Sequence, residues 1–176
     1  MHLPHALDVF GRLLLCVVLF VLPGCARDSE AAVRAQVGQW FFLGDALYFK
    51  SESQCTAAVY RVTVDRPRPQ LRVATDPEVA RAALRRNGVA ALRIEGYSPH
   101  DLTDALLLSG DGGFGKQALH ASALAAPCMK GTKAGARFFE ALTRPGATLA
   151  YDAESEGVMI FDEMRYLLFY VAGDVW

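Results

Sequence analysis

The sequence predicts an α+β domain whose antiparallel sheet combines an N-terminal hairpin with a C-terminal three-strand meander, packed against several helices. Two extended runs near the start, 46–50 and 56–64, are separated by a short polar turn and predict the hairpin. Three more runs, 147–152, 158–162 and 166–172, have short connections, which favours antiparallel pairing. Helical segments lie between the two groups, an arrangement typical of α+β folds.

The first helix is predicted to run from Ser29 to Gly38. Ser29 is a favourable N-cap residue, because its hydroxyl can accept a hydrogen bond from a free backbone amide of the first turn. Val33, Val37 and Trp40 follow at helical spacing and predict one buried face.

The N-terminal strands are bounded by residues that disfavour sheet structure. After the first helix, we expect the largely aromatic segment 40–43 to end at 44–45. The hairpin strands 46–50 and 56–64 follow. The alternating prolines of 66–69 end the second strand, because proline cannot donate a hydrogen bond to a ladder. Residues 71–74 are expected to form a further short strand.

Two helices in the middle of the chain begin with the same combination of residues. Residues 75–78 combine a capping residue, a proline in the first turn and an acid. This helix is expected to run to Arg86, before 87–88 supply its left-handed end. Residues 98–101 begin a second helix in the same way, with an acid in the capping-box position. Between the two helices, residues 89–95 are predicted to be extended.

The second half of the chain contains two more predicted helices. A glycine-rich break at 110–115 precedes an alanine-rich helix that is expected to end before Pro127, because proline disfavours a helix interior. Residues 132–143 form another predicted helix, which 145–146 close. The final run, 167–171, is apolar on both faces, and this predicts a central strand.

The first 25 residues have a pattern of their own. Arg12 precedes ten consecutive apolar residues, 13–22, and a proline and a glycine follow before Cys25. A transmembrane helix needs about 20 apolar residues, whereas ten residues of helix cover only about 15 Å. The pattern from Leu22 to Cys25 resembles the lipobox of bacterial lipoproteins, in which a peptidase cuts before the cysteine and a lipid is attached to its sulfur.

The resemblance implies a division of the chain into three parts. Residues 1–24 would be the signal peptide, 25–28 the lipidated cysteine with a short tether, and 29–176 a single globular domain. Ala26, rather than an aspartate, follows the cysteine, and this implies an outer-membrane location facing the periplasm. An ordinary signal peptide cut elsewhere and an uncleaved anchor are the alternatives.

The cysteines bear on the compartment. Cys16 lies in the predicted signal peptide and Cys25 would carry the lipid, which leaves Cys55 and Cys128. A pair in an oxidising compartment predicts a disulfide, and closing a loop of about 70 residues would stabilise the fold by roughly 4 kcal/mol. A metal pair or a redox-active pair is the alternative, but neither cysteine belongs to a C-x-x-C motif or has an adjacent histidine.

Two histidines follow the predicted signal peptide, His100 and His120. His100 and Asp104 lie one helical turn apart, with Asp101 between them and Ser98 nearby. A triad needs a base that reaches the nucleophile and is oriented by an acid. His100, Asp101 and Asp104 are therefore the candidate catalytic residues. The alternative is a solvated first turn in which Ser98 acts only as a cap.

Other polar groupings have simpler interpretations. Residues 110–116 match the G-x-x-x-x-G-K spacing of a phosphate-binding loop, but Gln117 stands where a Ser or Thr must hold magnesium, so no nucleotide is expected. Asp152, Glu154 and Glu156 alternate without a calcium-loop pattern, so we expect neither a metal nor a cofactor. No nucleic-acid partner is expected either.

Two further groups bear on contact with a membrane. Lys130, Lys133, Arg137 and Arg144 recur at helical spacing and either contact anionic headgroups or keep the helix solvated. The aromatic residues 40–42 lie near the predicted anchor and either enter the bilayer interface or belong to the core.

Three functions are open from these observations. The first is a non-catalytic envelope lipoprotein that is held on the membrane by its lipid and binds another envelope component, such as a protein. The second is a hydrolase of envelope polymers, which would need His100, Asp101 and Asp104 to converge in a cleft. The third is a carrier of a hydrophobic ligand, which would need an open pocket under the helices.

Overall fold

The computed structural model describes residues 26–108 and 113–173, the side chain of Leu124 excepted; the predicted signal peptide, 1–24, and Cys25 lie outside this part. Within it, seven strands form one sheet with helices packed against it, so the predicted α+β class is confirmed. The strands are β1 (Leu43–Ser51), β2 (Cys55–Val62), β3 (Val73–Ala74), β4 (Val89–Leu92), β5 (Thr148–Asp152), β6 (Gly157–Asp162) and β7 (Leu167–Gly173). The helices are α2 (Glu30–Gly38), α3 (Pro77–Asn87), α4 (Pro99–Leu108), α5 (Gly113–Met129), α6 (Lys133–Leu142) and the 3₁₀ helix η1 (Glu163–Arg165).

The strand order is β1-β2-β7-β6-β5-β4-β3. The N-terminal hairpin and the C-terminal meander are both present, and β7 joins them by pairing with β2 on one side and β6 on the other. The predicted central position of this last strand is therefore confirmed. The exception to antiparallel pairing is β3 with β4, which are parallel because helix α3 connects them and reverses the direction of the chain.

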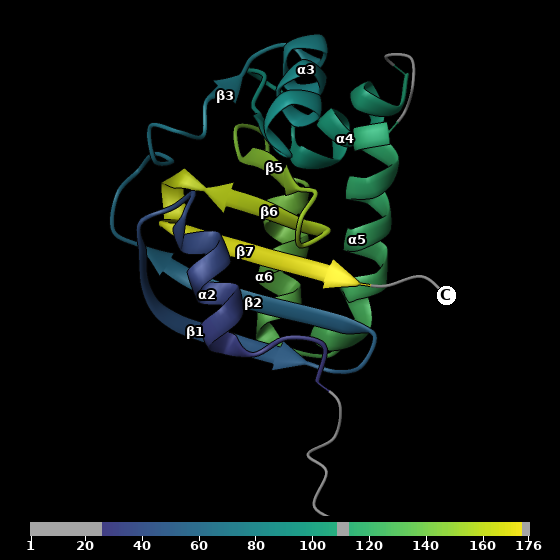
Figure 1. Ribbon diagram of the computed structural model, residues 1–176. Helices are drawn as coiled ribbons and strands as arrows, with labels where there is room; N and C mark the ends of the chain where they lie inside the picture. Colours follow the sequence, from purple (N-terminus) through teal and green to yellow (C-terminus); the bar gives the residue numbers. More distant parts are fainter. Residues whose placement is uncertain (1–25, 109–112, 174–176) are drawn as a thin grey trace, which may run out of the picture.

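Helices cover both faces of the sheet, as Figure 1 shows, with α2 on the near face and α6 behind the strands. Alternate residues of each strand enter two separate cores. In β7, Phe169 and Val171 pack toward α4, α5 and α6, whereas Leu168 and Tyr170 pack toward α2. The apolar run of β7 thus serves both cores.

Strand β1 begins earlier than expected. The predicted break at Gly44-Asp45 is wrong, because the strand runs from Leu43 through both residues. Its register against β2 shifts between Leu43 and Ala46 and again between Ala46 and Tyr48. Such bulges accommodate extra residues in one strand, so a glycine and an aspartate are tolerated inside it.

Helix α5 continues beyond its expected end. It was predicted to stop before Pro127, but it includes this proline and ends at Met129. The last turn is held from outside the helix: Cys128 is bonded to Cys55, and the hydroxyl of Tyr48 donates a hydrogen bond to the Cys128 carbonyl. These tertiary contacts offset the backbone hydrogen bond that proline cannot make.

The predicted disulfide between Cys55 and Cys128 is confirmed. The Cα atoms lie 6.0 Å apart, and 73 positions separate the two residues in sequence. Both cysteines are buried in the core, so the bond fixes the last turn of α5 to the first residue of β2.

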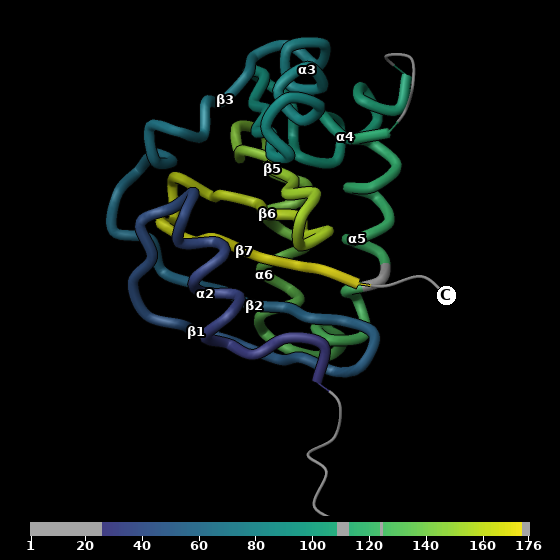
Figure 2. The backbone as a smooth tube through the Cα atoms, viewed as in Figure 1, coloured from purple at the N-terminus to yellow at the C-terminus, as the bar shows by residue number. Residues whose placement is uncertain are grey.

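The residues that follow the predicted lipid site are attached to the sheet. The backbone amide of Arg27 donates to the carbonyl of Glu52 (3.0 Å), and that of Asp28 donates to Ser51 Oγ (2.9 Å). Thr56 Oγ1 donates to Asp28 Oδ2 at 2.6 Å. Figure 2 shows this purple segment running beside the turn between β1 and β2. Arg27 and Asp28 are therefore fixed at one edge of the fold, which is formed by Ser51 and Glu52 and is here termed the tether edge.

Candidate functional site

The three candidate catalytic residues lie at the start of α4. Ser98 donates to Asp101 Oδ2 from its backbone amide at 2.9 Å and from its hydroxyl at 2.6 Å. The amide of Asp101 in turn donates to Ser98 Oγ at 3.2 Å, which completes a capping box. The hydrogen bonds from Ser98 hold the pKa of the Asp101 carboxyl below its usual value. Ser98 and Asp101 are thus engaged with each other in stabilising the helix start.

His100 and Asp104 are exposed on the same helix. Within the described part of the chain, no hydrogen bond joins His100 to Asp104 or to Ser98. The structure therefore brings Ser98 and Asp101 together as a cap, and it places His100 at the rim of a groove on the neighbouring helices.

This groove, of about 850 Å³, lies between α5 and α6. Its lining is mainly apolar, and Val171 of β7 contributes to it from the sheet. Two large apolar side chains at the groove are exposed to solvent: Leu119 of α5 is 50% exposed and Phe139 of α6 is 66% exposed. Exposed apolar side chains that surround a concave surface are characteristic of sites that bind ligands or partners.

The sequences of the two helices produce the groove. A Cβ on Gly135 would lie 2.4 Å from the Met129 carbonyl oxygen, so only glycine lets the first turn of α6 approach the end of α5 this closely. Elsewhere along the groove the facing positions carry small side chains, including Ala123 and Ala126 of α5 and Ala136 of α6. Because alanine fills little volume, the space between the helices stays open.

The ionisable residues of the groove are basic. His100 and Lys130 line it, and Lys116 and His120 line an adjoining hollow of about 420 Å³ on the outer side of α5. The two hollows share Leu119 and Ala123. Among the described residues that line either hollow, none is an aspartate or a glutamate.

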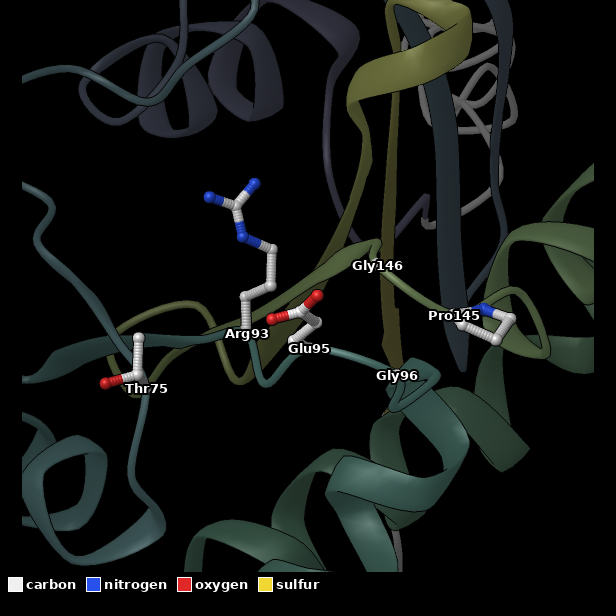
Figure 3. Close-up of a pocket in the computed structure, with 6 residues that line it drawn as sticks. All are labelled: Thr75, Arg93, Glu95, Gly96, Pro145 and Gly146. Atoms are coloured by element: carbon white, nitrogen blue, oxygen red, sulfur yellow. The ribbon is translucent and has the colours of Figure 1, made fainter.

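A second pocket, of about 430 Å³, lies where the parallel strands β3 and β4 end (Figure 3). Thr75 and Arg93 follow these strands, and Glu95 and Gly146 complete much of the wall. The guanidinium of Arg93 forms an ion pair with Glu163 outside this wall. Because Glu163 neutralises the charge of Arg93, the pocket attracts an anionic ligand less strongly.

Another hollow, of about 410 Å³, is lined by Arg61, Arg137 and Arg165 together with Glu140. Glu140 accepts hydrogen bonds from Arg165 at 2.5 Å and from Arg144 at 2.7 Å. The hydrogen bond with Arg165 lowers the pKa of Glu140 and raises the pKa of Arg165. Glu140 is therefore paired with Arg165 in a lining that contains two further arginines, Arg61 and Arg137.

In the described part of the chain, one cluster of residues has the composition of a metal site, and its cysteines are already engaged. Glu52, Cys55 and Cys128 lie within 4.8 Å of one another, but both sulfur atoms belong to the disulfide and cannot act as thiolate ligands. The carboxylate of Asp152 accepts hydrogen bonds from Gln36 and Trp40, which couples it to α2.

Comparison with protein-family models, with curated proteins and with solved structures finds no match to this chain. In the described part of the chain, no helix has the length and apolar composition required to cross a bilayer.

The groove was not located from the sequence, although one signal for it was present. Phe138 and Phe139 are adjacent in a helix, and adjacent helical side chains point in different directions. Phe138 packs against Phe169 in the core, with ring centroids 6.0 Å apart, which leaves Phe139 outside. Two residues of the groove had been singled out from the sequence: His100 as a candidate catalytic residue and Lys130 as one of four basic residues that could contact anionic headgroups.

Proposed function

We propose that the protein is a non-catalytic, lipid-anchored lipoprotein of the cell envelope whose groove between α5 and α6 binds a hydrophobic ligand. The observation that carries the proposal is the apolar groove itself, with Phe139 exposed beside it. A volume of about 850 Å³ lies within the range of roughly 300–1,000 Å³ that is usual for ligand pockets.

The lipid anchor in this proposal rests on the lipobox-like residues that end at Cys25. The attached tether agrees with it, because Arg27 and Asp28 are bonded to the tether edge within three residues of the modified cysteine. Such a short connection would hold the folded part close to the bilayer. An outer-membrane location facing the periplasm follows from Ala26 and is part of the same proposal.

A hydrolase has less support from the geometry. The hydroxyl of Ser98 donates to Asp101, and both groups stabilise the start of α4. The neighbouring carboxylate of His100, that of Asp101, is held by Ser98, and an exposed histidine without a hydrogen bond to an orienting acid is a poor general base. The binding of a protein helix in the same groove is the second candidate function, and the experiment below separates it from ligand binding.

The experiment uses the chain from residue 26 onward, here termed the folded body. All seven strands and both cores lie between residues 26 and 173, so the folded body contains the whole folded unit. The neutral fluorophore phenylnaphthylamine serves as the apolar probe. We expect saturable binding with enhanced fluorescence, which Ala136→Trp should weaken at least tenfold by filling the groove.

The matched control is Ala35→Trp, which places the same large side chain at an exposed alanine of α2 on the opposite face of the sheet. It should leave probe binding unchanged. A folded body that binds no probe, or that binds it equally after Ala136→Trp, would refute the groove as a ligand site. Binding of a helical partner without any probe binding would favour the protein-partner function instead.

A further inference from the structure

We propose that the ligand of the groove is an anionic phospholipid of the membrane that carries the anchor, with its headgroup at Lys130 and an acyl chain between α5 and α6. This inference rests on the proposed function, because it specifies the ligand of the same groove. It is carried by two observations: the sign of the charges that line the groove, and the position of Lys130 relative to the tether.

The charges of the groove complement an anionic headgroup. Lys130 and Lys116 form no ion pair with a carboxylate among the described residues, in contrast to Lys50, which is paired with Glu52 at 2.8 Å. Arg144 is likewise neutralised, by Glu140 and Asp162. The two lysines are thus free to meet a phosphate, and a lysine ammonium supplies three hydrogen-bond donors and a compact charge for it.

The groove has one end at the tether edge. Asp28 of the tether accepts a hydrogen bond from Thr56, and the preceding residue, Cys55, is bonded to Cys128 of α5. Lys130 follows Cys128 by two positions and lines the groove. This hydrogen bond and the disulfide therefore place the Lys130 end of the groove on the side of the fold from which the anchor would reach the bilayer.

The length and lining of the groove suit an extended chain. The lining runs from Thr132, the N-cap residue of α6, at the tether end to Leu142 at the other, which corresponds to about 15 Å of helix. The middle of the groove, with Ala126, Phe139 and Val171, is apolar. An acyl chain that entered beside Lys130 would remain in apolar surroundings along this path, while its phosphate stayed at the membrane surface.

The test measures extraction of labelled phospholipid from vesicles by the folded body. Donor vesicles of phosphatidylcholine contain a self-quenched fluorescent phosphatidylglycerol, or in parallel a phosphatidylcholine with the same label. Extraction relieves the quenching. We expect phosphatidylglycerol to be extracted about fivefold more than phosphatidylcholine, which is the size of effect that one exposed charge pair produces. Ala136→Trp should abolish extraction of both lipids.

Two pairs of variants locate the selectivity. Lys130→Gln should remove the preference for phosphatidylglycerol, whereas Lys50→Gln, at an exposed lysine that does not line the groove, should preserve it. Ala123→Glu adds a carboxylate to the rim and should weaken extraction of phosphatidylglycerol about fivefold relative to the isosteric Ala123→Gln.

The outcomes separate this inference from the proposed function. Equal extraction of the two lipids, blocked by Ala136→Trp, would overturn the anionic selectivity and leave a hydrophobic-ligand groove. Binding of phenylnaphthylamine without extraction of either phospholipid would overturn the phospholipid as ligand. If the relief of quenching with phosphatidylglycerol persists in the Ala136→Trp variant, the protein adsorbs to the vesicle surface. This result would also overturn the inference. Absence of probe binding altogether would refute the proposed function itself.

Discussion

Trp40 donates its indole N–H to the carboxylate of Asp152 across 3.2 Å, which joins the segment after α2 to the end of β5. The carboxylate also accepts a hydrogen bond from Gln36 at 2.7 Å, and Asp152 is only 3% exposed. Trp40 is half-buried, and the neighbouring Phe41 is fully buried against Phe161. These contacts hold the N-terminal helix on its face of the sheet.

The first prediction concerns this hydrogen bond. Trp40→Phe should lower the free energy of unfolding by about 1 kcal/mol, because a hydrogen bond to a buried carboxylate is lost. In an Asp152→Ala background the same substitution should cost clearly less, since its acceptor is already absent. Urea denaturation of the four chains measures the coupling. Additive losses would show that the two residues do not act together.

The second prediction concerns the disulfide between Cys55 and Cys128. Cys55→Ser and Cys128→Ser should each lower the stability by about 4 kcal/mol on the chain-entropy model, since either substitution opens the same loop. The double variant should be little worse than either single one. Thermal melting of the three variants without reductant provides the measurement, and losses that sum would argue against a shared bond.

The third prediction concerns Tyr60, whose buried hydroxyl has no hydrogen-bond partner among the described residues. Burial raises its pKa to about 12 in the folded state, whereas an unfolded tyrosine has a pKa of about 10. Because the folded pKa is the higher one, stability is retained below about pH 10 and lost as the pH rises toward 12. Tyr60→Phe should therefore melt no lower than the parent at neutral pH and should lose less stability in alkali.

The control for this prediction is Tyr48→Phe, the same substitution at a tyrosine whose hydroxyl donates to the Cys128 carbonyl. It should lower the melting temperature already at neutral pH. Melting curves at neutral pH and between about pH 10 and 12 compare the two variants. A large neutral-pH loss in Tyr60→Phe would show that its hydroxyl has a partner.

The fourth prediction uses the neighbouring phenylalanines of α6. Phe139→Ala should change the unfolding free energy by no more than about 0.5 kcal/mol, because Phe139 is 66% exposed. It should nevertheless weaken phenylnaphthylamine binding, because Phe139 lines the groove. Phe138→Ala should destabilise the fold by about 2 kcal/mol through lost packing on Phe169. A Phe139→Ala chain that binds the probe normally would exclude this ring from the site.

The fifth prediction concerns the anchor and uses the full chain in its own cell. Cys25→Ser should move the protein from the membrane pellet to the supernatant, because no lipid can then be attached. Ala26→Asp should divert it to the inner membrane, and Arg27→Ala should leave sorting unchanged. Membrane fractionation of the three variants is the measurement. An unchanged pellet for Cys25→Ser would refute lipid anchoring.

Local chemistry made much of the fold predictable. Ser29 and Asp76 accept hydrogen bonds from amides of the first helical turns, as their side chains require at N-caps. The run 167–171 is apolar on both faces because β7 lies between two cores. In both cases the structure follows from the local sequence: from a capping side chain at the helix start, or from apolar residues on both faces of a strand.

Features that depend on distant partners were not predictable in this way. The strand residues Gly44-Asp45 are tolerated because bulges against β2 accommodate them, and Pro127 stays helical because Tyr48 and the disulfide hold the turn that follows. The groove depends on the separation of α5 and α6, and that separation follows from the contact at Gly135. Composition alone does not specify such distances.

The irregular strand β1 affects whether neighbouring molecules can pair through the edges of their sheets. β1 forms one edge of the sheet and carries two register shifts, while the opposite edge strand, β3, has only two residues. Long, flat edges act as templates for intermolecular strand pairing, and bulges and short strands suppress it. Neighbouring molecules at high concentration would therefore lack a regular edge through which to polymerise.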